Sequence, residues 1–145
     1  MATNLFDLTG KTALITGSSR GLGRAFAEGL ASAGASIILN GMNRERLEVA
    51  EREMTQSGYH VEIAAFDVTD ESEVKSAFAK FDKAGINIDI LINNAGVQFR
   101  KSMVELETSD WHRVIDTNLT SAFVVGREAA KRMIERGYGK IINIG

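Results

Sequence analysis

The hydrophobic positions of the chain form two kinds of pattern, which alternate from one end to the other. Short continuous apolar runs predict buried strands, and apolar residues spaced by three or four positions predict amphipathic helices. Strands are predicted over residues 13–15, 35–41, 60–66, 88–92 and 140–145, and helices over residues 22–33, 44–57, 71–81 and 109–136. This alternation is typical of an α/β fold in which a doubly wound parallel sheet is joined by right-handed crossovers.

The helical spacing also predicts which faces are buried. The expected faces are Leu22, Ala25, Phe26, Leu30 and Ala33 on the first helix, Leu47, Ala50 and Met54 on the second, Val74, Ala77, Phe78 and Phe81 on the third, and Trp111, Val114, Ile115, Leu119, Ala122 and Ala129 on the fourth. Residues 70–73 have the spacing of a capping box. Between Ala122 and Val125 the fourth helix is apolar almost all round, so we expect it to contact both its own sheet and a second subunit.

Three glycines, Gly17, Gly21 and Gly23, separate the first predicted strand from the first helix. The first N–H groups of a helix have no partner within it and favour an anion. Glycines allow the chain to turn tightly and let a diphosphate approach the backbone closely. The turn therefore predicts a nucleotide site, against the alternative of a tight connection without a ligand.

Composition narrows the class of protein. The chain has 145 residues, 44% hydrophobic and 25% charged, with a net charge of −2, which gives no field that attracts nucleic acid or an anionic membrane. It contains no cysteine, which excludes disulfides and thiolate chemistry. The first seven residues lack the pattern of a secretory leader, and no apolar run approaches the roughly 20 residues of a membrane span. These features favour a cytoplasmic protein without membrane or nucleic-acid partners.

Two motifs together carry a family resemblance. Residues 16–23 (Thr-Gly-Ser-Ser-Arg-Gly-Leu-Gly) and residues 93–96 (Asn-Asn-Ala-Gly), directly after the fourth predicted strand, resemble the cofactor motifs of the short-chain dehydrogenase/reductases. The resemblance implies one Rossmann-type domain over residues 1–145 with strand order 3-2-1-4-5. It implies these cofactor-binding residues: Gly17, Ser18, Ser19, Arg20, Gly21, Leu22, Gly23, Asn40, Gly41, Asp67, Val68, Asn94, Ala95 and Gly96. Without it, residues 93–96 are simply a good turn, and Asp67 a loop acid near the next helix.

Asn118 lies within the predicted apolar stripe of the longest helix. A buried carboxamide costs about 1–3 kcal/mol unless it is paired. Thr117-Asn118-Leu119 resembles a helix motif of the family, whose asparagine belongs to an Asn-Ser-Tyr-Lys catalytic set and holds a water that links the lysine to a proton relay. The alternative is an asparagine that only satisfies backbone groups.

The cofactor prediction depends on the end of the second strand. Enzymes that select NAD usually offer an acid there, about 20 residues past the glycines, whereas this chain has Asn40 and Gly41 followed by Met42-Asn43-Arg44. Arg20 lies at the start of a helix, where a cation opposes the helix dipole unless an anion such as a 2′-phosphate offsets it. We therefore expect NADP(H), with NAD(H) still open; the alternative for Arg20 is a solvated surface arginine.

Substrate recognition is expected just beyond the second motif. Residues 93–100 resemble the gluconate 5-dehydrogenases of the family more than its 3-oxoacyl-carrier-protein reductases, and Gln98 and Arg100 are candidate substrate contacts. A substrate carboxylate would suit Arg100, although most loop arginines are merely solvated. The alternatives are a 3-oxoacyl-carrier-protein reductase and a non-catalytic dinucleotide sensor. His60 and His112 have no partner at metal-ligand spacing, so no metal site is expected and both histidines are interpreted as structural.

The resemblance covers the N-terminal, cofactor-binding part of a family member. The family places a serine after the fifth strand and a Tyr-x-x-x-Lys pair on the next helix, whereas Tyr59 and Tyr138 have Ile63 and Ile142 four residues on. These 145 residues alone are therefore expected to be inactive, and the chain is expected to be a fragment, or the ordered part, of a longer protein. Its last strand is expected to leave a bare apolar edge. Family members commonly form dimers or tetramers through the helix that contains Asn118.

Overall fold

The computed structural model describes residues 5–145, so the first four residues of the stretch considered for a leader lie outside it. The strands are β1 (Thr12–Ile15), β2 (Ser36–Gly41), β3 (Val61–Ala65), β4 (Ile90–Asn93) and β5 (Lys140–Asn143). They form one parallel sheet in the order β3-β2-β1-β4-β5, which confirms the predicted topology.

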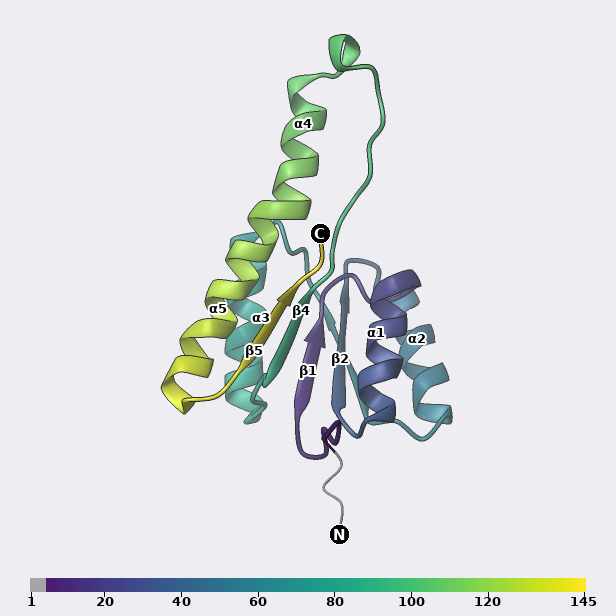
Figure 1. The fold of residues 1–145 in the computed structure, drawn as a ribbon, viewed down its shortest axis with the longest axis vertical. Helices are drawn as coiled ribbons and strands as arrows, with labels where there is room; N and C mark the ends of the chain where they lie inside the picture. The colour runs from purple at the N-terminus through teal and green to yellow at the C-terminus, as the bar shows by residue number, and fades with distance from the viewer. Residues whose placement is uncertain (1–4) are drawn as a thin grey trace.

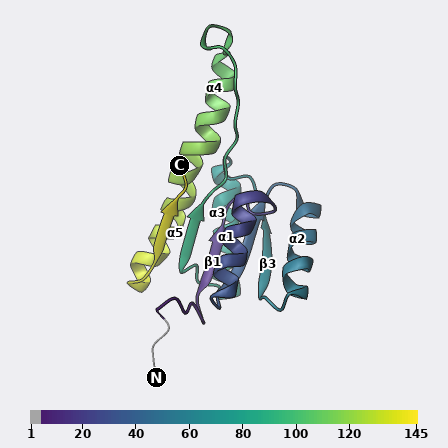
Figure 2. The same cartoon turned by 45° about the vertical axis from the view of Figure 1, so that its right-hand side comes forward.

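Helices cover both faces of this sheet (Figures 1 and 2). Their bounds are α1 (Gly21–Ser32), α2 (Arg44–Gln56), α3 (Glu71–Ala84), α4 (Thr108–Ile115) and α5 (Ser121–Arg136), with a 3₁₀ turn η1 (Met103–Glu105) and a π-helical turn η2 (Asp116–Thr120). Within residues 5–145, no helix combines the length and the apolar character needed to cross a membrane.

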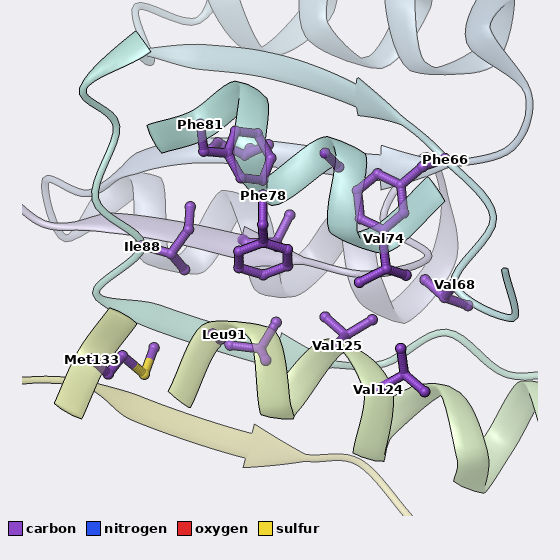
Figure 3. Close-up of a cluster of buried hydrophobic side chains, with 14 residues drawn as sticks. Phe66, Val68, Val74, Phe78, Phe81, Ile88, Leu91, Val124, Val125 and Met133 are labelled. Carbon is purple, nitrogen blue, oxygen red and sulfur yellow. The ribbon is translucent and has the colours of Figure 1, made fainter. Parts of the chain in front are cut away.

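The alternation of side chains along the strands creates two cores. On β1, Ala13 and Ile15 pack into the core beneath α1 and α2, whereas Leu14 faces the core beneath α3 and α5. Figure 3 shows the second core, where Phe78 of α3 and Val125 of α5 lie close to Leu91 of β4. The buried faces predicted for α2 and α3 are confirmed.

The face predicted for α1 is confirmed only in part, since Phe26 and Leu30 are half-buried and pack against the core beneath α1 and α2. Its buried residues are Gly23, Ala27 and Ala31, spaced by four, while Leu22 is 58% exposed and Ala25 is also exposed. Small side chains turned toward the sheet let this helix approach it closely. The prediction followed the larger apolar residues and so chose the neighbouring stripe.

The long helix over residues 109–136 is confirmed in extent but is not regular, because η2 interrupts it between α4 and α5. Only α5 packs on the sheet, and α4 extends past the carboxyl ends of the strands (Figure 1). Trp111 and Leu119 are therefore exposed, and so is Asn118, which corrects the prediction of a buried stripe around it. The loop after β4 contacts this part of the helix through Val97 and Phe99.

Candidate functional site

The glycine turn meets the turn that follows β4 at the carboxyl edge of the sheet. Gly17 and Gly21 have positive φ values of 63° and 60°. A Cβ at Gly17 would lie 2.9 Å from the Cα of Ala95, and one at Gly23 would lie 2.6 Å from Nδ2 of Asn94. Side chains at these two glycines would therefore push the two turns apart.

Thr16 and Asn94 lock the two turns together. The hydroxyl of Thr16 accepts hydrogen bonds from the N–H groups of Asn94 and Ala95, both at 2.9 Å. In return, Nδ2 of Asn94 donates to the carbonyls of Thr16 and Gly17 at 3.0 and 3.1 Å. Thr16 is 2% exposed, and the sequence analysis did not include it among the site residues. A polar residue at the end of an apolar strand was the feature that could have identified it.

Ser18 and Asn40 fix the glycine turn to the end of β2. The hydroxyl of Ser18 donates to the carbonyl of Ile15 at 2.7 Å and accepts the N–H of Asn40 at 3.0 Å. Nδ2 of Asn40 donates to the carbonyls of Ala64 and Phe66 at 3.0 and 3.1 Å. Both residues are buried, so their side chains shape the turn from within.

The turn after β3 also lies at the carboxyl edge of the sheet, beside the turns that follow β1 and β2. The carboxylate of Asp67 accepts hydrogen bonds from the N–H and the hydroxyl of Thr69 at 2.8 and 2.7 Å. The capping box is only half formed: Asp70 caps α3, but Glu73 accepts the N–H of Asp67, at 2.7 Å, instead of that of Asp70. Glu73 thereby holds the turn that carries Asp67 and Val68.

A groove of about 440 Å³ runs along these turns. Its lining residues are Gly17, Asn40, Gly41, Met42, Phe66, Asp67, Val68, Thr69, Ala95, Gly96, Val97, Arg113 and Thr117. It brings together predicted residues from four strand ends. It also adds six residues that were not predicted as site residues: Met42, Phe66, Thr69, Val97, Arg113 and Thr117. Arg113 and Thr117 could not be assigned without knowing that α4 extends over this edge.

The remaining predicted residues lie around this groove. Ser19 and Arg20 line a neighbouring groove of about 350 Å³ together with Arg46. Gly21, Leu22 and Gly23 form the first turn of α1. Gln98 and Arg100 are exposed on the loop after Gly96 and do not line the groove. His60 and His112 have exposed side chains, and residues 5–145 contain no group of three metal-ligating side chains.

The side chain of Asn118 both accepts a hydrogen bond from the loop after β4 and donates one to it. Its Oδ1 accepts the N–H of Val97 at 2.7 Å, and its Nδ2 donates to the carbonyl of Val97 at 3.0 Å. The carboxamide is thus satisfied by backbone groups and places the chain just after Gly96. A role in proton transfer stays a prediction.

The glycine turn after β1 and the turn after β4 lie at the carboxyl edge of a parallel sheet, where the strand order reverses. Sheets of this kind bind dinucleotides at this switch point. The family model described as "short chain dehydrogenase" matches residues 11–145. This chain belongs to the short-chain dehydrogenase family. Membership accounts for the contact between the two motifs, which lie far apart in the sequence.

Known proteins of this family resemble the chain over nearly its whole length. It is 45% identical to gluconate 5-dehydrogenase from Gluconobacter oxydans over 141 residues, which are 97% of this chain and 55% of that protein. It is 38% identical to a 3-oxoacyl-[acyl-carrier-protein] reductase from Aquifex aeolicus, over 94% of this chain and 56% of that one. The chain thus spans about half the length of these short-chain dehydrogenases.

Solved structures of short-chain dehydrogenases have the same fold as this chain. A provisionally named gluconate dehydrogenase from Agrobacterium tumefaciens has a TM-score of 0.95 and 66% identity, over 97% of this chain and 55% of that one. A gluconate 5-dehydrogenase from Burkholderia cenocepacia, in complex with NADP and tartrate, has a TM-score of 0.91 and 43% identity, over 95% of this chain and 54% of that one.

Proposed function

We propose that the chain is the cofactor-binding part of an oxidoreductase that transfers a hydride between NADP(H) and the keto group of a sugar acid, interconverting 5-keto-D-gluconate and D-gluconate. The observation that supports this most directly is the groove at the junction of the glycine turn and the Asn-Asn-Ala-Gly turn. The relatives named gluconate 5-dehydrogenase support the substrate class.

The residues of the groove suit a dinucleotide. The N-terminus of α1, where Gly21 is exposed, would hold the diphosphate. Asp67 and Val68 would lie against the adenine, and Ala95 and Gly96 would lie against the ribose and the nicotinamide. Bound NADPH supplies the hydride. The chain's own groups orient it, and Asn118 fixes the backbone at Val97 beside it.

A preference for NADP(H) rests on Arg20. Its guanidinium has no hydrogen bond or ion pair among residues 5–145, and it shares a groove with Arg46, whose guanidinium is also unpaired there. Gly41, at the end of β2, offers no acid to the ribose hydroxyls. Two unpaired cations near this strand end favour a 2′-phosphate.

A second subunit is proposed to cover the outer face of the long helix. Leu119, Phe123 and Ile134 are 64%, 61% and 78% exposed, and they lie on the side of this helix that does not pack on the sheet. An exposed apolar face of this kind marks an interaction surface. We propose a homodimer or homotetramer formed through it.

The test is an assay of the full-length protein with NADPH and either 5-keto-D-gluconate or a 3-oxoacyl thioester. Faster turnover of the keto-sugar acid supports the proposal. Faster turnover of the thioester would favour the second candidate, which the Aquifex relative supports. Binding of NADPH without oxidation of the cofactor in a single turnover, with either substrate, would indicate a dinucleotide sensor and contradict the enzymatic proposal.

A further inference from the structure

The loop between Gly96 and α4 is held to the rest of the protein at two places. The first is the bond between Asn118 and the backbone of Val97. The second is the ring of Phe99, over which the guanidinium of Arg113 lies at 4.9 Å from the ring centroid. In the part of the chain that the structure describes, no other hydrogen bond, ion pair or ring contact joins residues 98–106 to another element. Phe99 is therefore the main anchor of the loop beyond Val97.

Arg113 belongs to the cofactor groove as well. It lines this groove together with Thr117, one turn further along the helix, and with Asp67 and Thr69 from the turn after β3. Its one ion pair, to Asp110, is long at 3.9 Å, and its side chain makes no hydrogen bond within residues 5–145. A guanidinium can stack on a ring through its flat face while its in-plane N–H groups stay free to donate.

We propose that Arg113 is a positioning residue that couples the loop of residues 97–107 to the occupied cofactor groove. The flat face of its guanidinium holds Phe99, and its free N–H groups donate to polar atoms of the bound dinucleotide. Gln98 and Arg100, the candidate substrate contacts, flank Phe99 and are placed by it. Cofactor binding therefore orders the segment that receives the substrate. This inference rests on the proposed function.

The loop carries its own reporter, because Arg100 and Lys101 are exposed trypsin sites directly after Phe99. In the full-length protein, Phe99→Leu and Arg113→Gln should each speed cleavage at these sites about two- to five-fold, the effect of losing one exposed cation–π contact. Saturating NADP⁺ should slow this cleavage strongly in the wild type. It should slow cleavage much less in Phe99→Leu and hardly at all in Arg113→Gln. Arg52→Gln is the matched control, since Arg52 is exposed on α2 without an ion pair among the described residues.

Kinetics provide a measurement that a purely structural role would not change. Both variants should raise KM for the keto acid several-fold with little change in kcat, and only Arg113→Gln should also raise KM for NADPH. The double variant should be no worse than Arg113→Gln alone, because the two residues act through one contact.

The experiments distinguish a failure of the proposed function from a failure of the role proposed for Arg113. A wild type that neither binds NADP⁺ nor is protected by it contradicts the proposed function. A wild type that is protected, with Arg113→Gln equally protected or with additive effects in the double variant, overturns the role of Arg113 and leaves the proposed function standing. Lys83, exposed at the end of α3, provides an internal trypsin site whose cleavage should not respond to either variant.

Discussion

Thr16 shows how far the geometry of the site depends on a single hydroxyl. It accepts two backbone N–H groups of the turn after β4, while Asn94 donates to two carbonyls of the glycine turn. Four hydrogen bonds thus join two motifs that are separated by more than seventy residues in the sequence. The glycines make this contact sterically possible, and Thr16 and Asn94 make it specific.

Replacing Thr16 by Val should leave the N–H groups of the half-buried Asn94 and Ala95 without an acceptor. We expect the free energy of unfolding to fall by about 2–4 kcal/mol, since each unsatisfied buried group costs about 1–3 kcal/mol. Urea denaturation measures the loss, and fluorescence titration with NADPH should show weaker binding. Thr16→Ser keeps the hydroxyl and is the control. Equal losses in both variants would assign the effect to packing of the methyl group.

Arg20 should determine the choice between the two nicotinamide cofactors. In the full-length protein, Arg20→Ala should weaken NADPH binding by about 1–3 kcal/mol, the scale of a charge-assisted hydrogen bond, and should leave NADH binding nearly unchanged. Titration calorimetry with both cofactors measures the difference. Equal losses for the two cofactors, or a wild type that prefers NADH, would contradict the role of Arg20.

At the scale of elements, the helical pattern of the sequence does not predict two features: the π-helical turn η2 and the ion pairs between α3 and α5. Asn118 lies within η2 and bonds to Val97 on the neighbouring loop. Between α3 and α5, Arg132 makes a two-point contact with Asp82 at 2.6 and 2.8 Å. On α5 itself, Glu128 accepts Lys131 at 2.7 Å and Arg132 at 3.2 Å.

Asn118→Ala tests the proton-relay hypothesis. If Asn118 serves the relay, kcat of the full-length protein should fall while the affinity for NADPH stays the same. We expect this outcome, measured by steady-state kinetics and by cofactor titration on the same preparation. A variant with full turnover per folded molecule and a lower melting temperature would show that the side chain only satisfies Val97.

Glu128 should make stability depend on pH. Burial raises the pKa of this carboxyl, but the hydrogen bonds from Lys131 and Arg132 outweigh burial and hold its pKa below the usual value of 4.5. A carboxyl with a lowered pKa in the folded state stabilises the fold above its unfolded pKa, and this contribution is lost as the pH falls through the folded pKa. The free energy of unfolding should therefore decline below about pH 5.

The matched variants separate this carboxyl from the rest of the helix. Glu128→Gln should cost about 1–3 kcal/mol at pH 7 and show a smaller decline on acidification. Glu135→Gln, at an exposed site on α5 without an ion pair among the described residues, should change neither quantity. Urea titrations at pH 7 and pH 4 provide the measurement, and an unchanged pH dependence in Glu128→Gln would contradict the assignment.

At the scale of the whole molecule, most of the architecture could be predicted from sequence periodicity and most of the fine geometry could not. The strand order followed from the family resemblance, while the strand and helix positions followed from residues such as Ile90 and Phe78, whose burial is unambiguous. The fully buried positions of α1 were missed because glycine and alanine carry too little hydrophobic contrast to stand out. The exposure of Asn118 was missed because periodicity alone does not show where a helix extends past its sheet.

The outer side of the sheet at β5 makes a further prediction. Ile141, Ile142 and Ile144 are 40%, 46% and 38% exposed, and β5 pairs with β4 alone in the part of the chain that the structure describes. A protein of these 145 residues should therefore associate through this edge, and Ile142→Lys should reduce the association. Light scattering measures it. Equal scattering from both chains would place the association elsewhere, for example at Phe123.

The same 145-residue protein should not turn over substrate. It contains Asn118, but its tyrosines have Ile63 and Ile142, not lysine, four residues on, so it offers no group of that kind to protonate a developing oxyanion. The measurement is NADPH oxidation with 5-keto-D-gluconate, with a full-length relative as the positive control. Turnover comparable with that control would mean that the catalytic acid lies within these residues.

The π-helical turn η2 determines how α4 is rotated about the helix axis relative to α5. A π turn accommodates one residue more than an α-helical turn, and each residue of an α-helix advances about 100° around the axis. If Asp116–Thr120 adopted α-helical geometry with all of its residues kept, the extra residue would rotate α4 by about that angle relative to α5. Arg113 would then turn away from the groove, while the packing of α5 on the sheet stayed the same. The π geometry, by absorbing the extra residue, therefore sets the direction in which α4 presents its side chains.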